Sequence, residues 1–180
     1  MRKAQQPSSR SFWRDATGVV AVEFGIAAVP FFMMLIGILE AGLMFFTATL
    51  LEGGVNDASR LVRTGQVIDD SNPEASFRAK LCEKLILVDC QKVVIEIRAF
   101  PSFAVAGEDR PNYRTTTNQS GTAGDLMPRP IQLGSASQVM VSRVQYRYPF
   151  LSPVGTLISG STENSVPLLS TTVFKNEPYS

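Results

Sequence analysis

The side chains of this 180-residue chain with the most chemical potential are two carboxylates within a long apolar stretch and two thiols. Glu23 and Glu40 are the only charged residues between positions 19 and 51. A carboxylate near the centre of a bilayer costs roughly 2.5 to 3.5 kcal/mol, and less near an edge, so it usually has a partner. For Glu23 the alternative is an interfacial side chain that reaches toward the headgroups. The thiols are Cys82 and Cys90.

The residue inventory argues against catalysis and against a bound metal or cofactor. The sequence has no histidine, the commonest general base and metal ligand. It also has no Gly-rich phosphate loop and no G-x-S-x-G elbow, and the pair Asp69-Asp70 is typical of a solvated turn. Two thiols without histidine or a second pair do not make a zinc site. We therefore expect no enzyme, no metal and no cofactor.

The net charge of +1 is unevenly distributed along the chain. Residues 1–18 sum to +3, so residues 19–180 carry 13 basic and 15 acidic side chains, a net charge of −2. Without a basic stripe in this larger part, nucleic-acid binding is not expected. With 44% hydrophobic residues the chain is not disordered, and its length predicts one domain with an appendage.

Residues 19–51 predict a single membrane-spanning helix that follows a basic cytoplasmic leader, residues 1–18. As a helix, residues 19–39 would measure about 31 Å, close to the hydrocarbon thickness. Basic residues before the span place residues 52–180 on the outer side. The alternatives are a buried core helix, which nothing else in the chain could enclose, and a cleaved secretory signal, which lacks a clear A-x-A site. Glu40 is expected to mark the outer membrane-water boundary rather than a buried site.

Two helical segments are predicted beyond the span. Residues 52–66 continue the first helix as an amphipathic stem, with a weak point at Gly53-Gly54 and a stop at Gly65. A second helix begins at Asn72-Pro73, a cap residue followed by proline at the first helical position. Its apolar stripe is expected in the core: Phe77, Leu81, Leu85 and Val88.

Cys82 and Cys90 are predicted to form a disulfide, because they lie in a segment assigned outside the cytoplasm. One continuous helix over these positions would separate the two Cα atoms by about 12 Å, beyond the disulfide limit of roughly 7 Å. The second helix must therefore end and turn before Cys90. The C-x7-C spacing also lacks the redox C-x-x-C form.

Alternation of apolar and polar residues predicts three strands, over residues 92–100, 138–150 and 166–174. In the second strand the residues expected to face inward are Met140, Val144, Tyr146, Tyr148 and Phe150. They are expected to form an antiparallel sheet with polar outer faces, covered on one side by the stem and the second helix. Residues 101–137 contain several prolines and a polar tract, so a long loop is expected, as a mobile excursion or, alternatively, a partner surface. The fold class is α+β: a long helix with a small head of antiparallel sheet plus one helix.

Several motifs resemble those of a known family. Gly18 followed by VVAV, Glu23 and Phe24 is similar to the cleavage site of type IV prepilins. The wider string RDATGVVAVEFGIAAVPFFMMLIGILEAG, residues 14–42, resembles the start of TadE-like proteins, the pilin-like minor components of the tight-adherence (Flp) pilus machinery. VQYRYPFLSP, residues 144–153, and TTVFKNEPY, residues 171–179, resemble that family's closing motifs. The middle of the chain carries no such motif.

The resemblance implies roles for four residues. A prepilin peptidase would cut after Gly18 and leave Val19 as the new amino terminus. Glu23 would pair with the free amino terminus of a neighbouring subunit, which would offset its desolvation. Phe24 stands where the major Flp pilins usually have Tyr, which favours a minor component. The implied partners are the inner membrane, other pilin-like subunits (TadF-like proteins and the major Flp pilin) and the tight-adherence secretion machinery.

The sequence thus predicts a non-enzymatic minor pilin or pseudopilin that assembles tight-adherence pili. It is expected in the bacterial inner membrane as a single-pass protein, with a cytoplasmic N-terminus and a periplasmic head, or in the extracellular pilus. The alternatives are a pseudopilin of a type II secretion system and an uncleaved, membrane-anchored periplasmic binding or adhesin domain.

Overall fold

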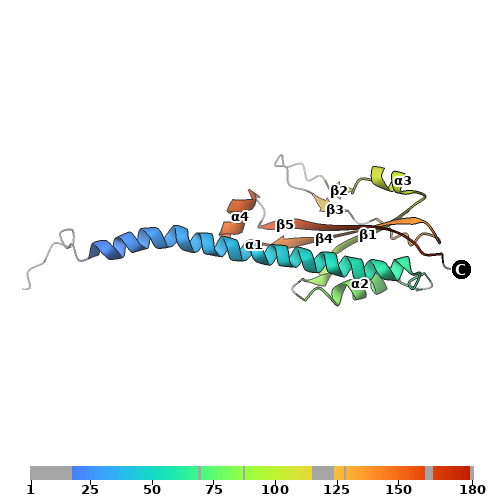
Figure 1. Cartoon of the computed structure of the whole chain (residues 1–180), viewed down its shortest axis with the longest axis horizontal. Coiled ribbons are helices and arrows are strands. Elements are labelled where there is room, and N and C mark those ends of the chain that lie inside the picture. Colours follow the sequence, from blue (N-terminus) through green and yellow to red (C-terminus); the bar gives the residue numbers. More distant parts are fainter. Residues whose placement is uncertain are drawn as a thin grey trace, which may run out of the picture.

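The computed structural model describes residues 18–68, 70–86, 88–114, 124–127, 129–160 and 164–178. The basic leader up to position 17, Asp69 and the polar tract 115–123 lie outside these residues, so the predictions for them are not addressed. The predicted α+β class is confirmed: a long N-terminal helix carries a small head at one end (Figure 1).

Helix α1 (Val19–Arg63) runs the length of the molecule. In its second half one face is buried in the head, at Leu51, Val55, Ala58 and Val62. The helix continues through Gly53 and Gly54 and ends where expected, because Gly65 takes a left-handed φ of 75° that few other residues tolerate. Gly54 has a packing reason: a Cβ there would lie 3.1 Å from the carbonyl oxygen of Leu81.

A second helix packs beside α1. Helix α2 (Pro73–Cys82) begins at the predicted cap, where the Asn72 side chain accepts a hydrogen bond from the Ala75 N–H. It ends at Cys82, and the chain then turns back to the short 3-10 helix η3 (Cys90–Lys92). Phe77 and Leu81 are fully buried on α2, and Leu85 and Val88 follow it into the same core, so the predicted apolar stripe is confirmed as core.

Three antiparallel strands form the sheet, in the order β1-β4-β5. They are β1 (Val94–Phe100), β4 (Val139–Pro149) and β5 (Ser165–Lys175). The register pairs Ile95 with Val144 and Val141 with Val173. The predicted inward residues of the middle strand are buried in the main core: Met140, Val144, Tyr146, Tyr148 and Phe150.

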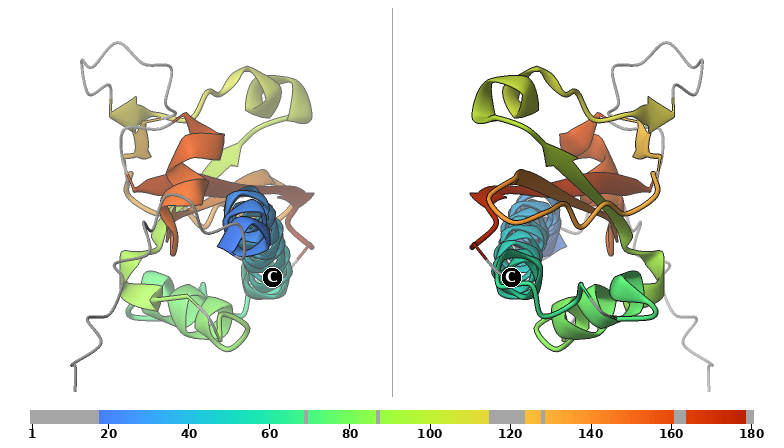
Figure 2. Two further views of the ribbon diagram at one scale, coloured as in Figure 1. Left: turned by 90° about the vertical axis from the view of Figure 1, so that its left-hand side faces the viewer. Right: turned by 90° about the vertical axis from the view of Figure 1, so that its right-hand side faces the viewer.

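The elements form three layers, which Figure 2 shows along the molecule's long axis. Helices α1 and α2 cover one face of the sheet. Over the other face lie α3 (Phe103–Glu108) and a two-stranded pair, β2 (Tyr113–Arg114) and β3 (Asp125–Leu126). A further short helix, α4 (Pro153–Ser159), connects β4 to β5 at the end of the head nearest the uncovered part of α1 (Figure 1).

The outer face of the sheet is polar, as predicted, but it is covered as well as the face toward the helices. Glu96, Arg143 and Gln145 are all at most 4% exposed. The described parts of the segment 101–137 pack over them: the Leu126 N–H donates to the side-chain oxygen of Gln145, and Ala106 of α3 joins a small apolar cluster with Phe100 and other residues of that face. Period-two alternation separates the two faces of a strand, but it does not say that the polar face meets water.

Candidate functional site

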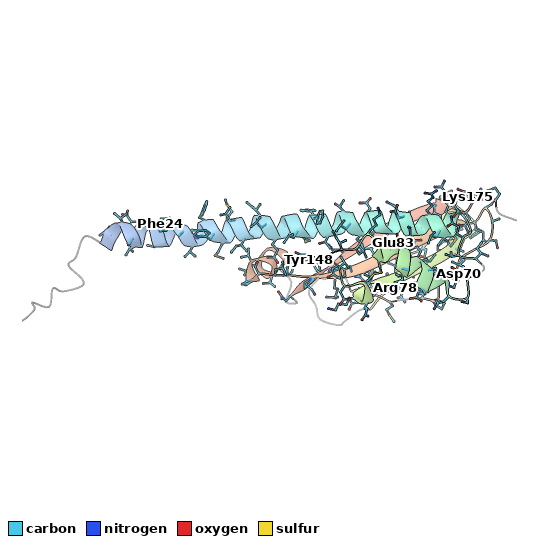
Figure 3. The ribbon with its side chains drawn as sticks, turned by 90° about the horizontal axis from the view of Figure 1, so that it is seen from below. Phe24, Asp70, Arg78, Glu83, Tyr148 and Lys175 are labelled. Atoms are coloured by element: carbon cyan, nitrogen blue, oxygen red, sulfur yellow. A yellow bond between two sulfur atoms is a disulfide. The ribbon has the colours of Figure 1, made fainter. Side chains whose placement is uncertain are left out.

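The candidate site is the half of α1 that the head leaves uncovered, together with its junction to the head. The large apolar residues from Val19 to Leu39 are all exposed, with Phe24 at 70% and Ile26 at 72%. Helix α1 is the one described helix long and apolar enough to cross a membrane. Figure 3 shows the contrast: Phe24 lies on bare helix, whereas Tyr148 lies in the head. An apolar surface of this extent requires lipid or a protein partner.

The motif residues lie together at the start of this half. Gly18 is the N-cap, with φ −87° and ψ −7°, and no described atom lies within 4 Å of the position that a Cβ would take there. Val19 is half exposed, and Glu23 is exposed one helical turn further on. Glu23 has no hydrogen bond or ion pair with another described residue. Because Val19 and Glu23 are four residues apart, they share one face of the helix.

Glu40 ends the uncovered half, and the expectation that it is not a buried site is wrong. It is 6% exposed. One carboxylate oxygen accepts hydrogen bonds from the Leu151 N–H at 2.6 Å and the Ser152 N–H at 3.2 Å, and the other accepts from the Ser152 hydroxyl. The chain that leaves β4 therefore folds back onto α1 at this level and satisfies the carboxylate.

A glycine on α4 makes this close approach possible. A Cβ at Gly155 would lie 2.9 Å from the Glu40 side-chain carboxyl carbon and 2.7 Å from the Cγ atom of Phe150. Such contacts are too short for any larger side chain to be accepted without movement. Beside this contact lies an apolar groove of about 300 Å³, lined by Gly37, Ala41 and Met44 of α1 and by Phe150 and Val166 of the head.

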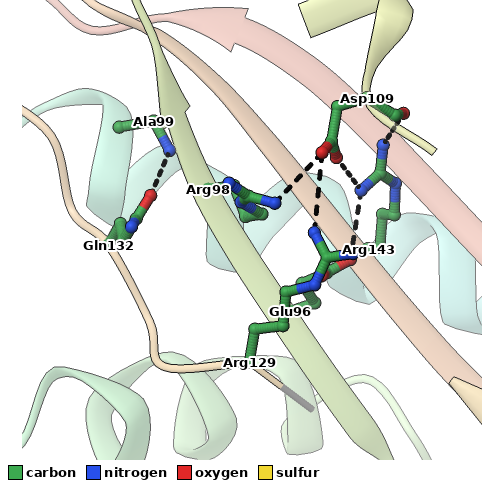
Figure 4. Close-up of polar contacts among 7 residues, drawn as sticks. All are labelled: Glu96, Arg98, Ala99, Asp109, Arg129, Gln132 and Arg143. Carbon is green, nitrogen blue, oxygen red and sulfur yellow. Dashed lines mark hydrogen bonds and ion pairs between the residues drawn. The ribbon is translucent and has the colours of Figure 1, made fainter. Parts of the chain in front are cut away.

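A buried ion-pair network joins the outer sheet face to the segment after α3 (Figure 4). Arg143 binds the Glu96 carboxylate at 3.1 Å and the Asp109 carboxylate at 2.6 Å, and donates to the Asp109 carbonyl oxygen at 2.8 Å. Arg98 contacts Asp109 at 3.0 Å, and Arg129 contacts Glu96 at 3.3 Å. The network holds the described part of the long loop onto the sheet.

The electrostatics of Asp109 follow from these contacts. Burial by itself raises the pKa of its carboxyl, but the hydrogen bond from Arg143 and the positive charges of Arg143, Arg98 and Arg129 outweigh it, so the pKa is lowered. Burial likewise opposes the charge of Arg143, yet its two carboxylate partners raise the pKa of its guanidinium. Both side chains therefore stay ionised near neutral pH.

A disulfide holds the end of α2 to the start of β1. Cys82 and Cys90 are bonded, with their Cα atoms 6.0 Å apart. Arg78 supports the same corner, because its guanidinium donates to the carbonyl oxygens of Cys90 at 3.0 Å and Val93 at 2.9 Å. Within the described ranges no group of three or more His, Cys, Asp or Glu side chains could hold a metal ion.

The structure brings some predicted residues together and separates others. Gly18, Val19, Glu23 and Phe24 share the first turns of α1, remote from Cys82 and Cys90 in the head. The partners of Glu40 could not be identified from the sequence, because they lie 111 and 112 positions away. One signal does exist: residues 148–162 are the longest stretch after position 52 without a charged side chain.

The fold is thus an exposed apolar N-terminal helix, long enough to cross a membrane, that carries a small α+β head. Residues 18–60 match the family model described as TadE-like protein. The match covers about a quarter of the chain, from the glycine of the motif to a point near the end of α1. It confirms the resemblance to TadE-like proteins over these residues. No curated protein and no solved structure matches the chain.

Proposed function

We propose that this protein is a minor pilin-like subunit of the tight-adherence pilus machinery. The uncovered half of α1 spans the inner membrane, and the head stands in the periplasm. The observation that carries the proposal is the bare apolar helix with an exposed carboxylate in its second turn, within the segment that matches the TadE-like model. An apolar helix that its own head leaves uncovered is available to pack against the helices of other subunits.

Processing after Gly18 is the first part of the proposal. The absence of a Cβ lets the backbone of Gly18 approach a peptidase centre closely. Cleavage would create an ammonium group at Val19. Because Val19 and Glu23 lie one turn apart, about 6 Å along the axis, a neighbour shifted along the helix by that amount would bring its amino terminus to Glu23. The pair would neutralise the carboxylate in a low-dielectric assembly.

The partners follow from the same assembly. A prepilin peptidase, TadF-like subunits, the major Flp pilin and the secretion machinery are proposed to contact the protein in or beside the membrane. The head is then the part left free for contacts in the periplasm or on the pilus. Its disulfide and its buried ion pairs support a rigid head that would survive export from the membrane.

N-terminal sequencing of membrane-extracted protein tests this proposal. In cells with an active prepilin peptidase the chain is expected to begin at Val19, and in cells without the peptidase at Met1. A chain that begins at Met1 in both would reject processing and favour the anchored binding-domain alternative.

Piliation of two charge variants extends the test to Glu23. Glu23→Gln is expected to leave membrane insertion intact and to abolish pili. Glu52→Gln, which removes an exposed carboxylate further along the same helix, is the matched control and is expected to retain them. Normal piliation of the Glu23 variant would refute the pairing role.

A further inference from the structure

The end of the head nearest the uncovered helix has an unusual surface for a protein exposed to water. Residues 148–162 carry no charged side chain. Two leucines of this segment are among the most exposed apolar residues of the head, Leu151 at 74% and Leu157 at 71%. Neither leucine belongs to a hydrophobic cluster of the head. We call the surface formed by Leu151, Leu157 and the adjoining apolar groove the head base.

The head base lies at the level where the proposed span ends. The groove between α4 and α1 is lined on the helix side by Gly37, Glu40, Ala41 and Met44. About 31 Å of helix separates Glu40 from Val19, which matches the thickness of the hydrocarbon core. A helix that crosses the bilayer from Val19 therefore brings α4 to the outer membrane-water interface.

The polar groups at this level are already satisfied inside the protein. The Glu40 carboxylate accepts from two backbone N–H groups and one hydroxyl at the junction with Ser152. A bare carboxylate at the edge of the hydrocarbon would be costly, whereas one that is buried and hydrogen-bonded leaves the surrounding apolar surface free to meet lipid. The groove itself is almost wholly apolar in its lining.

We infer that the head base is a lipid-binding surface that seats the head on the periplasmic leaflet of the inner membrane. Leu151 and Leu157 enter the boundary between headgroups and acyl chains, and the groove takes part of an acyl chain. An interfacial segment of this kind places its apolar side chains about 5–10 Å into that boundary. The inference rests on the proposed insertion of α1 and adds that the head is held against the bilayer.

Lipid fits these observations better than a neighbouring subunit does. The Leu151 N–H donates to Glu40, and α4 lies beside α1 where its uncovered half ends, so the apolar surface of the helix adjoins the head base. A surface shared with the bilayer needs no charge complementarity, and residues 148–162 offer none. Occupation by a neighbouring copy remains a distinct outcome of the experiment.

Fluorescence quenching of the full chain in vesicles tests the inference. The variants Leu151→Cys and Leu157→Cys are labelled with bimane without reductant, because the native cysteines are joined in the disulfide. The protein is reconstituted at low density into vesicles of phosphatidylethanolamine and phosphatidylglycerol. Phe103→Cys is the matched control, since Phe103 is also an exposed apolar residue of a short helix, 58% exposed, and α3 lies at the opposite end of the head.

We expect lipids with a doxyl group high on the acyl chain to quench the labels at positions 151 and 157 several-fold more than the label at 103. Aqueous iodide should show the reverse order. Protease protection of the same vesicles reports whether α1 has inserted. Iodide access at 151 and 157 equal to that at 103, in vesicles where α1 is inserted, would overturn the inference and leave the proposed function standing.

Varying the amount of protein per lipid distinguishes contact with lipid from contact with a second copy of the chain. Protection of the two labels at low density, unchanged as more protein is added per lipid, supports the lipid surface. Protection that appears only at high density, with no quenching by doxyl lipids, would overturn it in favour of a second copy of the chain. Failure of α1 to insert at all would contradict the proposed function and the inference together.

Discussion

Both halves of α1 carry large apolar side chains, but one half exposes them and the other buries them. From Val19 to Leu39 the large side chains are exposed on every side of the helix. Beyond Glu40 one face of the helix packs against the head, where Val55, Ala58 and Val62 have no exposed surface. Composition separates the halves only in part, because residues 41–51 carry no charge although Leu51 is buried in the head. The difference shows that a single helix can leave its apolar side chains uncovered at one end and contribute them to a core at the other.

The largest expected effect comes from a pair of phenylalanines that differ in this way. Phe77→Ala removes a fully buried ring and is expected to lower the free energy of unfolding of the head by about 3–5 kcal/mol. Phe24→Ala removes a ring that is 70% exposed and is expected to leave it unchanged. Denaturant unfolding in mild detergent, followed by near-ultraviolet circular dichroism, measures both. Equal losses of unfolding free energy in the two variants would contradict the distinction between a buried and an uncovered half of the molecule.

A second matched pair uses the two glutamates of the helix. Glu40→Ala leaves the partly buried backbone donors of Leu151 and Ser152 without an acceptor, so a loss of about 1–3 kcal/mol is expected. Glu23→Ala removes an exposed group and is expected to leave head stability unchanged. Hydrogen exchange of the segment 150–160 should accelerate only in the Glu40 variant. Unchanged exchange there would mean that α4 holds its place without the carboxylate.

The smallest effect is a pH dependence that belongs to the head alone. The pKa of Asp109 is lower in the folded protein than in the unfolded chain, because of Arg143, Arg98 and Arg129. Its contribution is therefore complete above the unfolded value of about 3.9 and is lost as the pH falls through the folded value. Unfolding should become easier below about pH 4, and Asp109→Asn should weaken that dependence. A variant with the same acid profile as the native chain would count against the network.

Much of the helix and sheet could be predicted from local patterns. The stop at Gly65, the cap at Asn72 and the inward residues of β4 are confirmed, because each depends on neighbours within a few positions. The short helices α3 and α4 were not predicted, since six and seven residues carry too little periodicity. The position of the described loop residues over the sheet also escaped prediction, because it depends on ion pairs between distant segments.

Some residues of the candidate site could likewise be predicted from the sequence, and others could not. Gly18, Val19, Glu23 and Phe24 could be named from the sequence because the motif is contiguous and lies on the uncovered half of α1. Glu40 could not be assigned, because its chemistry is set by Leu151 and Ser152 across the fold. The same chain reversal creates the apolar groove and exposes Leu157 at its edge.

By itself the sequence determined the length and polarity of α1, the order of the two longer helices and three longer strands, and the residues of the N-terminal motif. These properties follow from periodicity, capping and hydropathy, which act over a few residues or along one helix. Only the tertiary structure decided which charges are buried, how the carboxylate at position 40 is satisfied and which leucines remain bare. Those outcomes require contacts between residues that are 34 to 112 positions apart, and such contacts cannot be recognised from the periodicity of the sequence.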